Sequence, residues 1–294
     1  MFKRIAQTIR QHERTHAQQR LGRILDTAKN VGFDDTSRFV FFADCHRGDN
    51  GRADIFARNK GLFLDALQHY YQHGFTYVEV GDGDEMWQNR RFASIRHAHE
   101  RVFDLFHRFD RQDRLHLIVG NHDISGKRAA CVEKDGIFAT EGLVLTHAQR
   151  KQRILVAHGH QADYKNDRWP VMGRTTVRAL KHVQRLGVAR YASLPGNVWS
   201  ECAIDRRIRE WAHVHQQTII CGHTHRPTCA SSSAFPYFNP GSCLVPGSIT
   251  GIEIQNGCIS LVKWMSAQGQ RPHGMSRVRR ELVGRPRELR QLCA

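Results

Sequence analysis

Five short apolar segments each end in a turn that carries Asp, Asn or His, and this pattern constrains the fold more than any other feature of the chain. The segments are residues 38–43, 75–80, 114–119, 153–157 and 218–220. Their length and their Phe, Val, Ile and Leu content predict buried strands. Since stretches with helical spacing of apolar residues separate the first three segments, strands and helices alternate, which predicts an α/β fold.

Helices and a hairpin are predicted around these strands. Apolar residues recur at helical spacing over residues 62–70 and again over residues 93–109. Between residues 248 and 264 the apolar residues alternate as in β-strands, on either side of Asn256-Gly257. Because Asn-Gly between two such runs favours a tight turn, we expect a β-hairpin there.

The chain divides into a central domain with a basic segment at each end. We expect a basic helical segment over residues 1–35, the central domain over residues 36–266 and a loose basic tail over residues 267–294. Residues 164–215 are basic and helical in pattern, and they are interpreted as a helical cap insertion between two strands. The first helix is expected to dock its apolar face on the domain, with a position at a membrane interface as the alternative.

The composition of the chain limits which binding partners and which cellular compartment we expect. The 294 residues carry a formal net charge of +16, which favours a polyanionic partner: nucleic acid, an anionic membrane surface or a phosphorylated substrate. A basic surface without such a partner is the alternative. The sequence contains no run of about 18 apolar residues and no signal-peptide core. None of the eight cysteines forms a C-x-x-C pair, so we expect reduced thiols and a cytoplasmic protein, with a peripheral membrane position as the alternative.

The turns after the five predicted strands hold groups that bind metal ions. These groups are Asp44 with His46, Asp82, Asn121 with His122, His158, and His223 with His225. In open α/β sheets, sites form beyond the carboxyl ends of the strands, so the groups are expected to converge. Carboxylate, imidazole and amide oxygen suit ions such as Mn²⁺, Fe and Zn²⁺. Without His122, seven candidate ligands remain, which is enough for two ions about 3.5–4 Å apart that share one carboxylate.

The motifs D-x-H, G-D, G-N-H-D, H-G-H and G-H-T-H follow one another in this order at the strand ends. Together they resemble the motifs of the calcineurin-like metallophosphoesterases, over roughly residues 36–264. The resemblance implies a four-layer α-β-β-α sandwich, in which helices flank two sheets and a dinuclear metal site lies at one edge. It also implies a metal-dependent phosphoesterase, either a phosphatase or a phosphodiesterase, with two Mn²⁺ ions as cofactors and Fe or Zn²⁺ as alternatives.

Motif by motif, the resemblance assigns metal ligands. It implies that Asp44, His46 and His225 hold the first ion, that Asn121, His158 and His223 hold the second, and that Asp82 bridges them. A carboxylate has two oxygens, so a single Asp can serve both ions. Asp84 and Glu85 are candidates for groups behind the ligands, with a purely local role in an acidic turn as the alternative.

The resemblance also assigns catalytic groups. His122 would protonate the leaving oxygen and Asp123 would orient His122, with simple phosphate binding by His122 as the alternative. Arg47, Arg128 and His160 are candidates for contacts with the substrate phosphate. The implied reaction is the hydrolysis of a phosphoester by attack of a hydroxide that bridges the two ions.

Other functions stay open at this point. Gly81-Asp82-x-x-Glu85-x-Trp87 and Gly222-His223-Thr224-His225-Arg226-Pro227 also resemble the UDP-diacylglucosamine hydrolase branch, which cleaves a pyrophosphate in lipid A synthesis. That branch typically has Arg where this chain has His122, and the insertion of this chain is strongly basic, so a lipid-sugar substrate is an alternative only. A nuclease that acts on nucleic acid is a second alternative, and a non-catalytic module that binds anions or membranes is a third.

Overall fold

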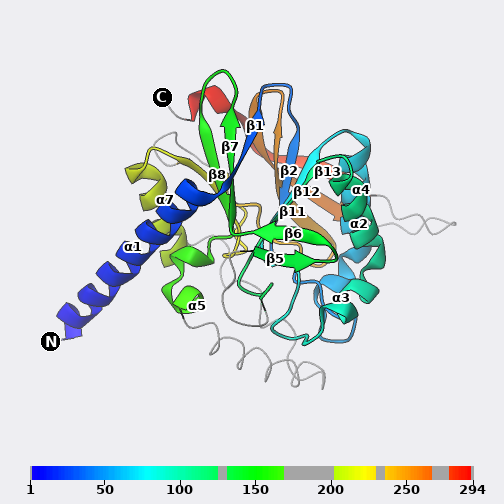
Figure 1. Cartoon of the computed structure of the whole chain (residues 1–294), viewed down its shortest axis with the longest axis horizontal. Coiled ribbons are helices and arrows are strands. Elements are labelled where there is room, and N and C mark those ends of the chain that lie inside the picture. Colours follow the sequence, from blue (N-terminus) through cyan, green and yellow to red (C-terminus); the bar gives the residue numbers. More distant parts are fainter. Residues whose placement is uncertain (1, 125–130, 169–201, 230–235, 267–277, 293–294) are drawn as a thin grey trace.

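The computed structural model describes residues 2–124, 131–168, 202–229, 236–266 and 278–292. Its strands form two sheets that lie face to face, with helices on their outer sides (Figure 1). In spatial order, the larger sheet contains β13 (Val278–Glu288), β12 (Cys258–Ser266), β11 (Ser248–Gln255), β2 (Phe39–Phe42), β3 (Thr76–Val80), β4 (Leu115–Ile118), β6 (Ile137–Thr140) and β5 (Cys131–Lys134). The smaller sheet contains β1 (Lys29–Phe33), β7 (Gly142–His147), β8 (Arg153–Ala157), β9 (Thr218–Cys221) and β10 (Tyr237–Phe238).

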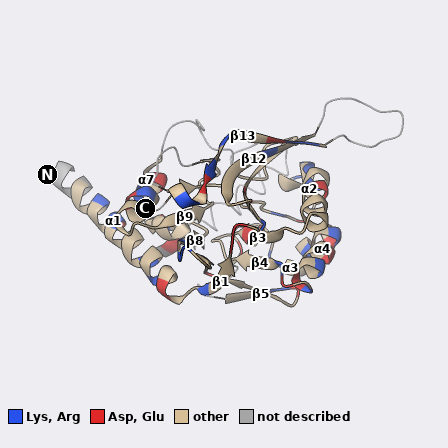
Figure 2. Ribbon diagram, turned by 90° about the horizontal axis from the view of Figure 1, so that it is seen from above, with Lys and Arg blue, Asp and Glu red and all other residues tan. Residues whose placement is uncertain are grey.

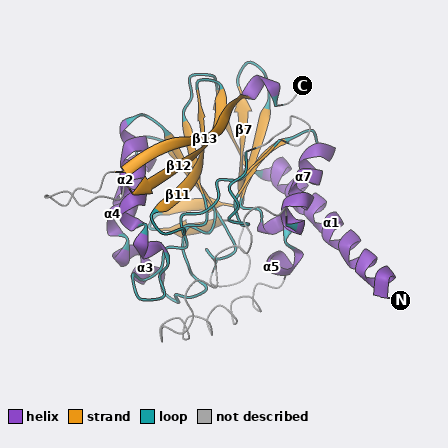
Figure 3. Cartoon of the chain, turned by 180° about the vertical axis from the view of Figure 1, so that it is seen from behind, coloured by secondary structure: helices purple, strands orange, loops and turns teal. Residues whose placement is uncertain are grey.

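Helices form the two outer layers. The α-helices of the described residues are α1 (Phe2–Thr27), α2 (Lys60–Gln72), α3 (Phe92–Ala98), α4 (Glu100–Asp110), α5 (Tyr164–Arg168) and α7 (Ala203–Val214). Short 3₁₀ turns are η1 (Phe56–Arg58), η2 (His160–Ala162) and η3 (Leu289–Gln291). In the view of Figure 3, α2 and α4 lie beside one sheet, and α1 and α7 lie on the other side of the molecule. The predicted α-β-β-α sandwich is confirmed.

The two faces of β2 show how the layers are packed. Phe39 and Phe41 lie in the core between the two sheets, whereas Val40 and Phe42 lie in the core between the larger sheet and helices α2 and α4. Successive side chains of a strand point to opposite faces, so both faces of this strand are buried. This explains why its sequence is a continuous apolar run rather than an alternation of apolar and polar residues.

Helix α1 docks on the smaller sheet, as its apolar spacing predicts. Leu21 and Ile24 are buried in one cluster with Val144 and Leu155 of that sheet. Trp211 of α7 belongs to the same cluster, so α1 and α7 together form this outer layer. Among the helices of the described residues, none combines the length and the apolar character that crossing a membrane requires.

The basic residues are spread over several elements. Lys and Arg positions occur on α1, α4 and β13, with acidic positions close by (Figure 2). On β13, for example, Arg280 donates through Nε to Glu253 Oε1 at 2.8 Å. Some of the basic side chains are therefore paired with acidic ones within the fold, while the net charge of +16 remains.

The C-terminal region differs from the predicted loose tail. Residues 278–288 form the edge strand β13, which pairs antiparallel with β12, and Leu289 and Leu292 after it are buried between the sheets. Most side chains of β13 are exposed or half-buried, so its sequence lacks the apolar pattern that reveals an inner strand. The predicted N-terminal helical segment likewise ends in a strand, β1, which pairs parallel with β7.

One helical prediction needs correction, the cap prediction lies largely outside the described residues, and the hairpin prediction is confirmed. The single helix expected over residues 93–109 is broken at His99, which is fully buried and has Nε2 3.3 Å from Asp54 Oδ2. Of the expected cap over residues 164–215, residues 169–201 lie outside the described residues, and α7 belongs to the outer layer of the sandwich. At the hairpin turn, Asn256 and Gly257 have φ values of 51° and 67°, as the tight turn requires.

Candidate metal centre

The loops that follow β2, β3, β4, β8 and β9 carry all seven predicted ligands. Within the larger sheet β2, β3 and β4 run parallel, and within the smaller sheet β8 and β9 run parallel, so the carboxyl ends lie together in each sheet. Hydrogen bonds join the two sets of loops. His223 N donates to Asp44 Oδ2 at 2.9 Å, and His158 Nδ1 lies 2.9 Å from Val80 O. The predicted convergence of strand ends is therefore present in the structure.

Five of the seven predicted ligands have a left-handed backbone conformation. Their φ values are 52° for Asp44, 48° for His46, 50° for Asp82, 69° for His223 and 55° for His225. Such a conformation costs a non-glycine residue of order 1–3 kcal/mol and is concentrated at functional sites. The strain indicates that the positions of these side chains, rather than the lowest backbone energy, determine the shape of the loops.

Two glycines allow the loops to come this close. A Cβ atom on Gly120 would lie 2.1 Å from Asp82 Oδ1, and a Cβ atom on Gly222 would lie 2.7 Å from Asp44 Oδ2. Both distances are too short for a non-bonded carbon and oxygen. Any other residue at either position would therefore displace a carboxylate of the site.

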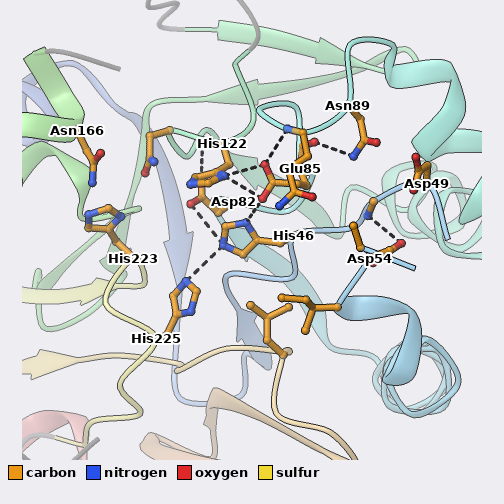
Figure 4. A pocket seen from close by; sticks show the side chains of 16 residues that line it. His46, Asp49, Asp54, Asp82, Glu85, Asn89, His122, Asn166, His223 and His225 are labelled. Atoms are coloured by element: carbon orange, nitrogen blue, oxygen red, sulfur yellow. Dashed lines mark hydrogen bonds and ion pairs between the residues drawn. The ribbon is translucent and has the colours of Figure 1, made fainter. Parts of the chain in front are cut away.

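The first group of ligands brings together Asp44, His46 and His225. One ligand atom from each lies within 4.8 Å of the others. His225 Nε2 lies 3.2 Å from Asp44 Oδ1. His46 Nε2 lies 3.3 Å from His225 Nε2 (Figure 4). These are the three side chains that the resemblance assigns to the first ion.

The second group brings together Asp82, His158 and His223, again with one ligand atom from each within 4.8 Å of the others. Asp82 Oδ2 lies 3.2 Å from His158 Nε2 and 3.7 Å from His46 Nε2. The same carboxylate oxygen thus faces both groups, which is the position that a bridging ligand needs. Asp82 Oδ1 accepts a hydrogen bond from His122 N at 2.7 Å.

Three buried ligand atoms support the fit of these residues to metal ions. Asn121 Oδ1 makes no hydrogen bond with any described residue, and Asp44 Oδ1 and His158 Nε2 have as nearest partners only the other candidate ligands His225 and Asp82, each at 3.2 Å. A buried polar atom without a hydrogen bond costs about 1–3 kcal/mol. A divalent cation would satisfy all three atoms, and carboxylate, amide and imidazole are ligands that such ions accept.

The charge of the site also favours cations. Although burial alone would lower the pKa of His46, the hydrogen bond to Glu85 and the charge of Asp82 raise it to about 10. Burial is likewise opposed at His158, where Asp82 raises the pKa to about 9. Both shifts show that the carboxylates of the site attract positive charge, which metal ions would supply in place of protons.

Glu85 holds the predicted catalytic imidazole. His122 Nδ1 lies 2.9 Å from Glu85 Oε1, and His46 Nδ1 lies 3.0 Å from Glu85 Oε2. The His122 ring also stacks on Trp87, with 3.9 Å between ring centroids and 22° between planes. Against the effect of burial, the charge and hydrogen bond of His122 lower the pKa of Glu85 to about 2. Glu85 therefore orients one imidazole of the metal site and the predicted acid at the same time.

Asp123 does not orient His122 as predicted. Its carboxylate accepts hydrogen bonds from Gly120 N at 2.7 Å, Asp84 N at 2.9 Å and Lys134 Nζ at 2.5 Å. These bonds fix the loop after β4 instead. The observed partner of His122 is Glu85. The sequence predicted Glu85 only as a group behind the metal ligands, not as the residue that orients His122.

Arg47 lies beneath the site, and the predicted contact with substrate phosphate is wrong. Its side chain is fully buried, with Nη1 and Nη2 donating to Glu79 at 2.5 and 2.8 Å and Nε donating to Asp84 at 2.9 Å. Lys134 Nζ lies 2.8 Å from the other oxygen of Asp84 and also binds Asp123. These five residues form a buried ionic network under the loops after β2, β3 and β4.

A pocket of about 260 Å³ opens beside the predicted ligands (Figure 4). Its lining includes the ligands and acid His46, Asp82, Asn121, His122, His223 and His225. The rest comes from Gly48, Asp49, Ala53, Asp54, Ile55, Glu85, Gln88, Asn89, Asn166 and Leu244. His160 is not among the described lining residues. It is buried beside His158 and His223, and burial and these two neighbours hold its pKa well below the usual value. Arg128 lies outside the described residues.

Comparison with known proteins assigns the chain to a family. The model of the calcineurin-like phosphoesterase superfamily domain matches residues 89–254, more than half of the chain. The match begins after Asp44, His46 and Asp82, so the roles of these three residues depend on the geometry described above. A search of curated proteins found no significant match.

Solved structures resemble the chain only remotely. Vacuolar protein sorting 29 of Cryptosporidium parvum is 12% identical, with a TM-score of 0.43 and an alignment that covers 86% of this chain and 100% of that one. A cold-active protein-tyrosine phosphatase of Shewanella is 14% identical, with a TM-score of 0.39 and 80% of each chain covered. The family assignment therefore depends on the family model alone. The chain belongs to the calcineurin-like phosphoesterase superfamily and is a metal-dependent phosphoesterase.

Proposed function

We propose that this protein hydrolyses phosphoester bonds at a centre of two divalent metal ions. The proposed ligands are Asp44, His46 and His225 for the first ion, Asn121, His158 and His223 for the second, and Asp82 for both. The observation that supports the proposal most directly is the convergence of six of these side chains into two groups, Asp44 with His46 and His225 and Asp82 with His158 and His223, with Asp82 Oδ2 facing both groups. Mn²⁺ is the first choice of metal because the set offers oxygen and imidazole but no thiolate, and Fe and Zn²⁺ are the alternatives.

The chain itself supplies acid catalysis and orientation. Two bound ions would activate a water molecule and neutralise the charge of the reacting phosphoryl group. His122 uses Nδ1 to contact Glu85, so Nε2 is the nitrogen left to donate a proton to the leaving oxygen. The contact with the Glu85 carboxylate fixes the direction of the ring. Stacking on Trp87 restrains the ring in this orientation.

The pocket supports a compact substrate. Its volume of about 260 Å³ is slightly below the range of roughly 300–1,000 Å³ that is common for small-molecule sites. Ala53, Ile55 and Leu244 contribute apolar lining, and Gln88 and Asn89 contribute amides. We therefore propose a phosphomonoester or phosphodiester of a compact organic group. The UDP-diacylglucosamine-type pyrophosphate and nucleic acid are the alternative substrates.

Metal-dependent turnover tests the proposal. Protein freed of metal with a chelator would be assayed with Mn²⁺, Fe²⁺ or Zn²⁺ on p-nitrophenyl phosphate and bis(p-nitrophenyl) phosphate. The alternative substrates, UDP-diacylglucosamine and single-stranded DNA, would be run beside them. We expect turnover of an aryl ester only when an ion is added. Equal turnover without any ion, or none with every ion and ester, would contradict the proposal, and faster cleavage of an alternative substrate would redefine its class.

The role of His122 can be tested separately. For His122→Ala, we expect kcat on an alkyl phosphate to fall by about 10²–10⁴-fold, since an alkoxide needs a proton to leave. The loss on p-nitrophenyl phosphate should be much smaller, because nitrophenolate leaves without a proton. An equal loss on both esters would show that His122 binds the phosphate instead of protonating the leaving oxygen.

A further inference from the structure

The imidazoles of the proposed centre each have a second nitrogen, and oxygen atoms hold three of these nitrogens. His46 Nδ1 lies 3.0 Å from Glu85 Oε2, and His158 Nδ1 lies 2.9 Å from the backbone oxygen of Val80. His223 uses the opposite nitrogen: its Nε2 lies 3.2 Å from Asp163 Oδ2. Such contacts fix the tautomer and the direction of a metal-binding imidazole.

Asp163 is itself held firmly. It lies between η2 and α5, and its side chain is only 16% exposed. Its Oδ1 accepts from Lys165 N at 3.2 Å and Asn166 N at 3.4 Å, as a residue that caps a helix does, and its Oδ2 accepts from Asn166 Nδ2 at 2.8 Å. These contacts set the orientation of the carboxylate independently of His223.

We propose that Asp163 is a positioning residue for the second metal ion. Its carboxylate accepts the proton of His223 Nε2 and so holds the tautomer in which Nδ1 keeps its lone pair for the ion. The inference rests on the proposed dinuclear centre, and it adds a residue that no motif of the sequence marks. Asn166, which shares the Asp163 carboxylate, lines the pocket. Asp163 thus fixes one ligand of the second ion relative to the pocket lining.

A series of substitutions separates this role from capping of α5. Asp163→Asn keeps an oxygen that can accept from His223, whereas Asp163→Ser keeps a capping hydroxyl that is too short to reach it. Asp163→Ala removes both functions. Lys165→Gln is the matched control, because Lys165 is exposed and only its backbone contacts Asp163. The melting temperature of each variant would be recorded to establish that it is folded.

Binding of Mn²⁺ to the metal-free full-length protein is the main measurement. Calorimetric titration, together with the electron paramagnetic resonance signal of free Mn²⁺, would give the affinity of each ion without an activity assay. We expect two ions in the wild type and in Lys165→Gln. In Asp163→Ser and Asp163→Ala, one of the two should bind about 10–100-fold more weakly, with Asp163→Asn in between and the other ion unchanged.

A long-range ¹H–¹⁵N correlation spectrum of the metal-free protein gives an independent result. His223 should carry its proton on Nε2 in the wild type and should populate both tautomers in Asp163→Ser. Wild-type affinity for both ions in Ser and Ala variants would overturn the inference, and so would a loss confined to Asp163→Ala, which would make Asp163 a helix cap only. If the wild type binds no Mn²⁺, the proposed centre itself is wrong. If the wild type binds two ions and the variants bind both as tightly, only the role of Asp163 is wrong.

Discussion

The half of the proposed centre around His46 and the half around His223 differ in what holds their imidazole rings. His46 is held by Glu85, which has a side chain that is 8% exposed and also binds His122. His223 is held by Asp163, which precedes a short helix near the surface and has a side chain that is 16% exposed. A ligand supported from the core shares the stability of the core, whereas one supported from a peripheral helix can be weakened alone.

The layers behind the two halves extend this difference. Under the first half lies the buried ionic network that includes Arg47 and Lys134. Behind the second half, Asp167 of α5 contacts His16 Nε2 at 2.7 Å and Arg20 Nε at 3.1 Å, both on α1. The N-terminal helix therefore contributes to the support of the second half. Changes near the first half should affect folding and chemistry together, while changes near the second should affect mainly metal binding.

The largest effect is expected where the two halves share a ligand. Asp82→Asn removes the bridging charge, so binding of both ions should weaken and kcat should fall on the order of 10³-fold, since metal ions supply several kcal/mol of transition-state stabilisation. Steady-state kinetics with Mn²⁺ and the metal content of the purified protein measure this. Asp26→Asn, at an exposed position of α1, is the control. Weakened binding of only one ion would show that Asp82 belongs to one half.

The next effect concerns the ionic network under the first half. Arg47→Met leaves Glu79 buried without its guanidinium partner and Asp84 with only part of its neutralising charge, so the free energy of unfolding should fall by about 3–5 kcal/mol. Urea denaturation of the metal-free protein measures it. Arg279→Met, at a side chain that is 72% exposed, should change the same quantity by no more than about 0.5 kcal/mol. A raised KM with unchanged stability would restore the role in substrate binding that the sequence suggested for Arg47.

Sequence reasoning found the groups that follow strands but not what lies behind them. Asp44, Asp82 and His158 could be predicted because each stands at the end of an apolar run, and the parallel strands bring such ends together. The role of Arg47 could not be predicted in this way. It depends on Glu79, whose side chain lies in the adjacent strand β3, and no local pattern indicates that the two side chains meet.

The same limit explains the errors at His122 and at the chain ends. Two acidic residues, Glu85 and Asp123, are both close to His122 in the motifs, and only the packing of the loops shows that Glu85 reaches its ring. The edge strands β1 and β13 have largely exposed faces, so burial imposes little alternation on their sequences. Contacts between residues that are far apart in the sequence form only when the sheets assemble, so local sequence patterns do not predict them.

Glu85→Gln tests the first half as Asp163→Ser tests the second. An amide holds the rings of His46 and His122 less firmly than a carboxylate does, so one ion should bind about 10–100-fold more weakly and kcat should fall as well. Mn²⁺ titration and steady-state kinetics of the two variants would be compared, with Glu133→Gln at an exposed position as the control. Glu85→Gln and Asp163→Ser should weaken different ions, and their effects should add in the double variant. Weakening of the same ion by both would remove the distinction between the halves.

The smallest effect is expected from pH. Against the effect of burial, the site's carboxylates raise the pKa values of His46 and His158 to about 10 and about 9 in the metal-free protein, from the usual 6.5. Each protonated ring therefore stabilises the metal-free fold fully below pH 6.5, and this contribution is lost as the pH rises through the folded-state pKa. Bound ions require neutral imidazoles, so the increase in Tm on adding Mn²⁺ should grow between pH 6.5 and 9, by about 2–4 °C for each kcal/mol involved. In His158→Gln, the Mn²⁺-induced increase in Tm should grow less with pH, because the contribution of the second half is absent. If the increase in Tm stays constant or shrinks as the pH rises, protons and metal ions do not compete for these imidazoles.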